Sequence, residues 1–200
     1  MENDAPTPRS YVIDRSKLPA KFPTHAHAPA FWESLGRAVA TLGFLEEMLK
    51  RAVYALTGTS PAPTEEADQA AAVEQWGVLL ARTIVNPLNP VIDTFAKAAK
   101  DNPQVRIENL EDFLRDLKAA ARVRNIICHG SWSPPDSNGA CRAFYVTGKP
   151  GDQEVFDSAV TVAWLDQLQA HTCELACEVL NSVTHTGYQF PGSNGPGRPV

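Results

Sequence analysis

The sequence predicts an all-α protein: an up-and-down antiparallel bundle of four to five helices, with a small β-hairpin or a long loop before the last helix. Apolar residues recur every three to four positions over several long stretches, which is the period of an amphipathic helix. Short connections rich in Pro, Gly and Asn separate these stretches. Long helices joined by short loops pack antiparallel to their neighbours in sequence, so a bundle is expected.

The chain divides into three parts by composition. Residues 1–29 are rich in proline and have no sustained apolar period, so they are expected to form an extended N-terminal arm. Residues 30–185 hold the helical stretches and are expected to form one helical domain. Residues 186–200 are rich in glycine and proline and are expected to be a disordered C-terminal tail.

Helix-breaking residues mark the ends of the expected helices. Asn-Pro pairs beginning at Asn86 and Asn102 close two of them, because proline cannot continue a helix. Gly130 follows another, in the position where a left-handed cap is expected. Strand-forming residue types alternate in the turn-rich segment that follows, so a hairpin of residues 141–147 with 154–156 is expected. The expected helices span residues 31–56, 65–85, 91–100, 107–129 and 162–185.

The bulk composition restricts the partners and the location of the protein. A net charge of −5 at pH 7 gives no global field that attracts nucleic acid, so any RNA contact has to come from a local basic patch. No apolar run approaches the about 20 residues that span a bilayer, and the N-terminus lacks the basic-then-apolar order of a signal peptide. The 4 cysteines follow no framework spacing. We therefore expect a cytoplasmic protein without a membrane partner.

One acidic residue, Glu46, interrupts the apolar seam of the first expected helix. The seam is otherwise continuous at helical spacing. Its apolar members are Trp32, Leu35, Val39, Leu42, Leu49, Val53 and Leu56. Carboxylates are rarely buried unless they are paired, so Glu46 either has a cationic partner or turns out to solvent beside Glu47.

One arginine, Arg124, lies at the centre of an apolar face on the fourth expected helix. That face also holds Leu110, Phe113, Leu117, Ala121 and Cys128. Because a guanidinium is costly to desolvate alone, Arg124 needs a carboxylate, a carbonyl or an incoming anion, and Glu46 is the candidate partner. The alternative interpretation is a buried pair that only fixes the register of two helices.

A second face of the same helix is basic. Arg115, Lys118, Arg122 and His129 lie within about 60° of one another on a helical wheel. Such a stripe can guide a phosphate backbone toward the histidine, which makes its cations candidate RNA-binding residues. The alternative, a solvated helix face, is favoured for the stripe taken alone.

The most specific pattern of the chain closes this helix. Arg124, Asn125 and His129 precede Gly130 with the spacing R-N-x-x-x-H-G. This pattern resembles the signature of the HEPN superfamily (higher eukaryotes and prokaryotes nucleotide-binding), and the first expected helix is similar to those of bacterial HEPN-like proteins. The resemblance covers the whole helical domain. It implies a helical bundle, a homodimer whose two motifs meet across a cleft, and metal-independent endoribonuclease activity.

The resemblance makes Arg124, Asn125 and His129 the candidate catalytic residues, with Glu46 in support. RNA cleavage without metal needs a proton acceptor for the 2′-OH, a proton donor for the leaving 5′-oxygen and positive charge near the phosphorane. His129 suits either proton transfer, Arg124 the charge, and Asn125 the orientation of the histidine ring. Residues i and i+5 lie about 140° apart, so Arg124 and His129 converge through the long arginine side chain and a last turn that tightens or unwinds.

RNA, a second copy of the chain and an antitoxin protein are the expected partners, in a toxin–antitoxin or phage-defence setting. The alternative function is a non-catalytic dimeric HEPN module that binds RNA, a nucleotide or a protein. No cofactor is expected, since no glycine-rich phosphate loop occurs. No metal is expected either: His171, Cys173 and Cys177 lack a further ligand pair, and the cysteines are expected to pack in the core.

Overall fold

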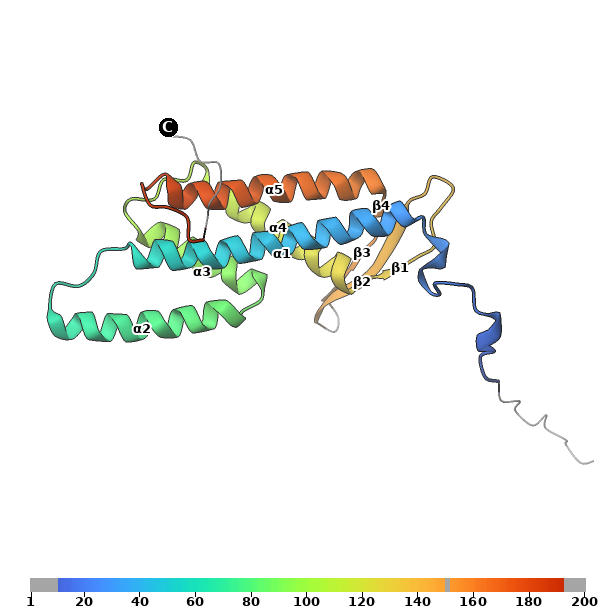
Figure 1. Ribbon diagram of the computed structural model, residues 1–200, viewed down its shortest axis with the longest axis horizontal. Helices are drawn as coiled ribbons and strands as arrows, with labels where there is room; N and C mark the ends of the chain where they lie inside the picture. Colours follow the sequence, from blue (N-terminus) through green and yellow to red (C-terminus); the bar gives the residue numbers. More distant parts are fainter. Residues whose placement is uncertain (1–10, 150–151, 193–200) are drawn as a thin grey trace, which may run out of the picture.

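A computed structural model describes residues 11–149 and 152–192 and confirms the helical bundle with a small sheet before the last helix (Figure 1). Two 3-10 turns, Arg15–Lys17 and Thr24–Ala26, precede the bundle. The helices are α1 (Pro29–Gly58), α2 (Glu66–Val85), α3 (Leu88–Asp101), α4 (Leu110–His129) and α5 (Val162–Thr184). Each lies within a few residues of its expected range.

Successive helices alternate in direction, so α1, α3 and α5 run one way and α2 and α4 the other (Figure 1). Helix α1 is central: its most extensive contact is with α5, and it also packs against α2, α3 and α4. The seam expected on α1 is buried, with Leu42, Leu49, Val53 and Leu56 all inaccessible to solvent. Burial of these side chains against the other helices is the main stabilising contribution to the fold.

A buried asparagine joins the ends of two helices. Asn102 caps the C-terminus of α3, and its Nδ2 donates to the carbonyl oxygen of Leu56 at 2.8 Å and to the Oγ1 of Thr59 at 3.0 Å. Both acceptors lie at the C-terminal end of α1, where backbone carbonyls lack helical partners. The Asn-Pro pair at residue 102 therefore ends α3 and ties it to α1.

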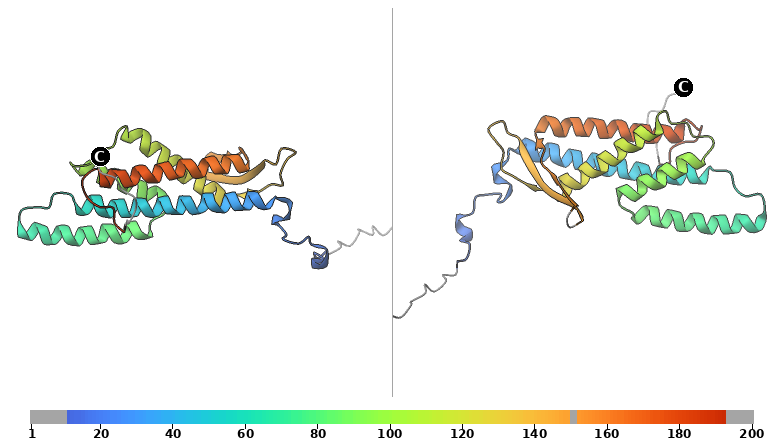
Figure 2. Two further views of the ribbon diagram at one scale, coloured as in Figure 1. Left: turned by 45° about the horizontal axis from the view of Figure 1, so that its top comes forward. Right: turned by 180° about the vertical axis from the view of Figure 1, so that it is seen from behind.

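The sheet forms next to the C-terminus of α4. Strand β1 (Ser131–Trp132) pairs with β2 (Cys141–Lys149), which also pairs with β3 (Asp152–Phe156) and β4 (Ala159–Val160), all antiparallel. Val146 lies opposite Val155, which confirms the expected hairpin. Figure 2 shows from behind how α4 crosses the bundle and ends at this sheet.

The expected left-handed cap at Gly130 is wrong. Its φ of −69° and ψ of 146° are extended, because the chain passes straight from α4 into β1. Glycine is needed there for space instead. A Cβ at this position would lie 2.6 Å from the carbonyl oxygen of Ile126 and 3.0 Å from the Cβ of Ala143 on β2.

The C-terminal segment differs from the expected disordered tail at its start. Phe190 is 2% exposed and belongs to the core, and Arg51 of α1 donates to the carbonyl oxygen of Pro191 at 3.1 Å. An apolar ring within reach of the bundle gains by burial even in a glycine-rich context. The predictions for residues 1–10 and 193–200 lie outside the described residues.

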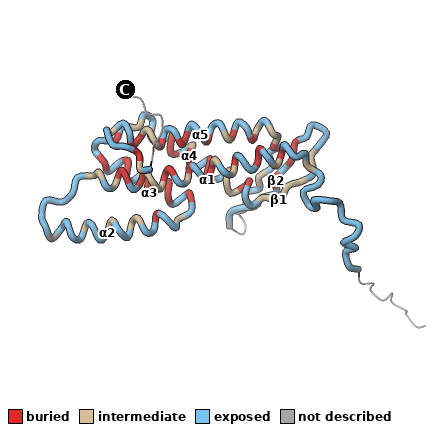
Figure 3. The backbone as a smooth tube through the Cα atoms, viewed as in Figure 1, coloured by how far each residue is buried: buried red, intermediate tan, exposed pale blue. Residues whose placement is uncertain are grey.

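Core and surface are unevenly distributed among the helices. The buried positions follow α1, α3, α4 and α5, whereas α2 is exposed or only partly covered along most of its length (Figure 3). None of the helices in the described part of the chain is long and apolar enough to cross a membrane.

Substitution of Gly130 by alanine should lower the free energy of unfolding by about 1–3 kcal/mol, because the added methyl group overlaps backbone and a packed neighbour. Gly36→Ala is the matched control, since nothing lies within 4 Å of its Cβ position on α1. That change should stabilise the helix by about 0.5–1 kcal/mol. Urea unfolding of the two variants measures both effects, and equal midpoints would contradict the close approach at Gly130.

Candidate functional site

The predicted partnership between Glu46 and Arg124 is confirmed. Arg124 Nη2 lies 3.7 Å from Glu46 Oε2, across the contact between α4 and α1. The Glu46 side chain is 18% exposed and that of Arg124 33%, so the pair is partly shielded from water. Glu46 therefore does not turn out to solvent.

A second cation shares this carboxylate. Lys50, one turn along α1, places Nζ 2.8 Å from Glu46 Oε1 and holds the shorter of the two contacts. One carboxylate between two cations leaves one positive charge uncompensated within the cluster of Glu46, Lys50 and Arg124. The remaining contact that orients the guanidinium is weak, since Arg124 Nη1 lies 3.4 Å from Asn125 Oδ1. The cluster can thus attract an anion with donors that Glu46 does not saturate.

His129 is exposed at the last residue of α4. The expected tightening or unwinding of the last turn is wrong: the amide of Gly130 donates to the carbonyl oxygen of Ile126 at 2.8 Å, which is α-helical bonding to the end. With the helix regular, Arg124 and His129 stay about 140° apart around its axis. The structure therefore brings Arg124 together with Glu46 but not with His129 in one chain. The orientation of the His129 ring by Asn125 stays a prediction.

The basic stripe of α4 is accompanied by acids. Arg115 pairs with Asp112 at 2.6 Å, and Lys118 pairs with Asp93 of α3 at 2.9 Å. These pairs are solvent-exposed, so each is worth about 0–1 kcal/mol and can open when a phosphate approaches. The arrangement matches a solvated helix face, and RNA binding by Arg115, Lys118 and Arg122 stays a prediction.

Sequence reasoning missed the role of His27. Its Nε2 lies 2.8 Å from the carbonyl oxygen of Ser133, and because a carbonyl only accepts, Nε2 carries the proton. The ring stacks on Phe31 and meets the edge of Trp32. His27 thereby anchors the end of the arm to the segment that follows His129. No spacing in the sequence signals this contact, since its partner is a backbone atom 106 residues away.

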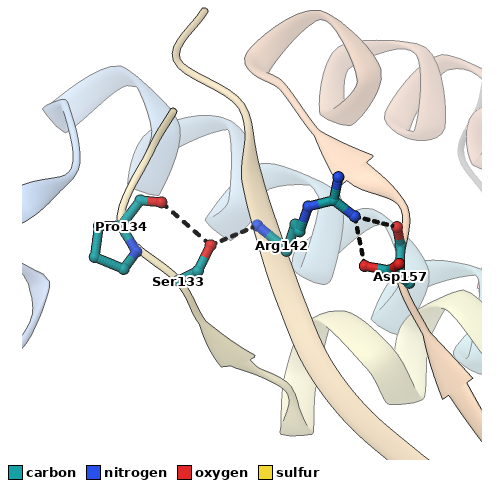
Figure 4. A network of polar contacts seen from close by, with 4 residues as sticks. All are labelled: Ser133, Pro134, Arg142 and Asp157. Atoms are coloured by element: carbon teal, nitrogen blue, oxygen red, sulfur yellow. Dashed lines mark hydrogen bonds and ion pairs between the residues drawn. The ribbon is translucent and has the colours of Figure 1, made fainter. Parts of the chain in front are cut away.

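A shallow hollow of about 330 Å³ lies over the strands beside the α4 terminus. Arg142 donates Nη1 to the carbonyl oxygen of Asp157 at 2.7 Å and pairs with its carboxylate (Figure 4). The backbone amide of Arg142 donates to Ser133 Oγ at 3.0 Å. These bonds hold the strands around the hollow, and the carboxylate compensates the charge of Arg142.

The expected core packing of Cys173 and Cys177 is wrong. Cys128, Cys173 and Cys177 are exposed rather than packed in the core, and only Cys141 is buried. Burial raises the pKa of the Cys141 thiol, so it stays protonated and acts as a small apolar group. Within residues 11–149 and 152–192, no three His, Cys, Asp or Glu side chains are grouped so as to hold a metal ion.

Comparison of the chain with family models, curated proteins and solved structures finds no match. The geometry of the site and the R-N-x-x-x-H-G pattern therefore carry the functional argument by themselves.

Replacement of Glu46 by alanine should destabilise the fold by about 1–2 kcal/mol, because it leaves Arg124 and Lys50 partly buried without their shared carboxylate. This value lies between the about 0–1 kcal/mol of exposed pairs and the about 3–5 kcal/mol of fully buried ones. Glu47→Ala is the control, since Glu47 is 54% exposed and pairs with Arg51 at the surface. Thermal melts compare the two, and an equal shift in Tm would show that the Glu46 cluster contributes no more than a surface pair.

Proposed function

We propose that this protein is a HEPN-type endoribonuclease that cleaves RNA without a metal ion and works as a homodimer. The observation that carries the proposal is the uncompensated positive charge of the Glu46, Lys50 and Arg124 cluster. Arg124, the member of this cluster on α4, lies on the same helix as the exposed His129, in the sequence pattern R-N-x-x-x-H-G. An anion-attracting group and a proton-transfer group are the two parts that phosphodiester transfer requires.

The proposed reaction is an internal transesterification. His129 accepts the proton of the ribose 2′-OH, and the 2′-oxygen attacks phosphorus. Arg124 stabilises the phosphorane, because its planar guanidinium can donate to two phosphate oxygens. The bond from phosphorus to the 5′-oxygen then breaks, the 5′-oxygen takes a proton, and a 2′,3′-cyclic phosphate remains. The reaction is confined to RNA because the nucleophile is the 2′-OH.

A homodimer is part of the proposal for a geometric reason. A regular α4 holds Arg124 and His129 about 140° apart, so one chain does not direct both groups at one phosphate. Two α4 termini that face each other let the arginine of one chain act with the histidine of the other, and supply a second histidine to protonate the leaving oxygen. RNA lying in such a cleft would displace the exposed acidic partners of Arg115 and Lys118.

A non-catalytic HEPN module that binds RNA, a nucleotide or a protein is the second candidate. The contact between Arg124 and Glu46 favours it, because an arginine held by a carboxylate can serve mainly to fix the position of α4 on α1. Both candidates fit a cytoplasmic protein, and an antitoxin protein is a proposed partner in either case.

RNA cleavage by the purified protein should continue in EDTA and disappear in His129→Ala, while the helical content stays unchanged because His129 is exposed. Products separated by gel and mass spectrometry should end in 2′,3′-cyclic phosphates. A substrate with one 2′-deoxy nucleotide at the cleavage position should resist, because it lacks the nucleophile. Equal cleavage of DNA, or activity that depends on added Mg²⁺, would exclude this mechanism.

Arg124→Lys should separate the two candidate functions. Lysine keeps the charge next to Glu46 but loses the planar fork, so an enzyme should lose at least about 100-fold in kcat, equivalent to roughly 2.7 kcal/mol of transition-state stabilisation. In a binding module the same change should lower ligand affinity and stability without any such rate effect. Single-turnover cleavage and a thermal melt on one preparation measure both. A stable variant with unchanged cleavage would remove Arg124 from the active site.

A further inference from the structure

Helix α2 has an apolar face that nothing in the described chain covers. Thr83 is its buried residue, whereas Val78 and Val85 are 49% and 80% exposed. Figure 3 shows α2 as an exposed helix at the margin of the bundle, toward the end away from the sheet. Because helices in proteins owe most of their stability to a packed apolar face, such a helix is incomplete without a partner.

The uncovered residues form one continuous surface. On an ideal helix the exposed residues centred on Val78 share an arc of about 120°, on the side opposite Trp76, Leu80 and Thr83, which are partly or fully buried. The arc, named the α2 outer face below, holds Ala71, Glu74, Gln75, Val78, Ala81, Arg82 and Val85, all of which are exposed. Its midline, from Ala71 through Val78 to Val85, is apolar, whereas a solvated helix face normally carries polar residues along its whole width.

We propose that the α2 outer face binds the same face of a second copy of the chain, with the two helices antiparallel. Charge complementarity selects this partner. Glu74 and Arg82 are the charged residues of the face. They lie about 40° on either side of Val78 around the helix, and Val78 is midway between them in sequence. A two-fold axis at Val78 therefore sets Glu74 of each copy opposite Arg82 of the other. A parallel pair would set Glu74 against Glu74.

The surroundings of these two charges agree with the pairing. Neither Glu74 nor Arg82 makes an ion pair or a side-chain hydrogen bond with the described residues of its own chain. Ala71 and Ala81, on the same face as Val78, are small enough to let the two helix axes approach closely. One pair of helices buries less than the about 1,600 Å² of a typical stable interface, so the association should depend on protein concentration.

This contact goes beyond the proposed function, because α2 lies away from the sheet at which α4 ends (Figures 1 and 2). The two proposals are therefore separable by mass. If both contacts form, two different two-fold interfaces give a tetramer where their axes meet at a right angle, and a longer open assembly otherwise. If only the α2 contact forms, the protein is a dimer whose two His129 residues lie far from the shared axis.

Multi-angle light scattering of the parent protein and of the variant Val78→Glu, at about 5–100 µM, tests the α2 contact. The variant places a charge at the two-fold axis. Val78 is half exposed, so the variant should fold, and circular dichroism checks this. The molar mass should fall to that of a dimer if the α4 contact also forms, and to that of a monomer if it does not. Phe44→Glu on α1 is the matched control, with 47% exposure in the parent, and should keep the parent mass. A parent protein that is monomeric throughout, or a Val78→Glu variant of unchanged mass, overturns the proposal. A dimer that becomes a monomer supports it and contradicts the dimer at α4.

Charge exchange tests the antiparallel register without an apolar change. Glu74→Arg and Arg82→Glu should each raise the dissociation constant at least about tenfold, because each creates two like-charged contacts. An equimolar mixture of the two variants should associate as the parent does, since each mixed pair regains both opposite-charge contacts. If the mixture does not associate more tightly than either variant alone, the proposed register is wrong.

Discussion

The apolar seam of α1 is the constraint on which the rest of the structure depends. The other four helices all pack against α1, and the residues that it presents to them are almost entirely aliphatic. Apart from the buried Ser34 near the start of the helix, the exception is Glu46. A carboxylate in such a seam is tolerated only where cations reach it, so α4 has to cross α1 at the level of Glu46 and bring Arg124 there. One acidic residue thus helps to fix both the register of two helices and the position of the candidate site.

Lys50 changes the electrostatic character of that site. With Arg124 alone, Glu46 would form a neutral pair, and the guanidinium would be committed to it. Because Lys50 makes the shorter contact with Glu46, the Glu46 carboxylate orients Arg124 without cancelling the positive charge of the guanidinium. This arrangement suits an arginine that has to keep its position in the absence of a ligand and bind an anion when a ligand is present. The spacing of four residues between Glu46 and Lys50 was visible in the sequence as a favourable helical pair.

The other half of the candidate site depends on the sheet. His129 ends α4, and the next residues leave at once as a strand because Gly130 allows β2 to come close. His27 then fixes the end of the arm to the same segment through the carbonyl oxygen of Ser133. His129 therefore projects from a helix end that is held by the sheet and by His27, while the His129 side chain itself is exposed to solvent. Such a group is available to a ligand or to a second copy of the chain.

The sequence by itself determined the order and approximate limits of the helices, because these follow from local periodicity. It also named the hairpin and the pairing of Glu46 with Arg124, each beside an alternative: a long loop for the hairpin, and a solvent-exposed Glu46 for the pair. The tertiary structure alone decided the extended backbone of Gly130, which depends on a strand closing over the helix end. It also decided the exposure of Cys173 and Cys177 and the burial of Phe190, since residue type sets a preference for the core but not a distance to it. The outward apolar face of α2 belongs to the same class. Helical periodicity predicts that a face is apolar, whereas only the packing of the whole chain shows that nothing described covers it.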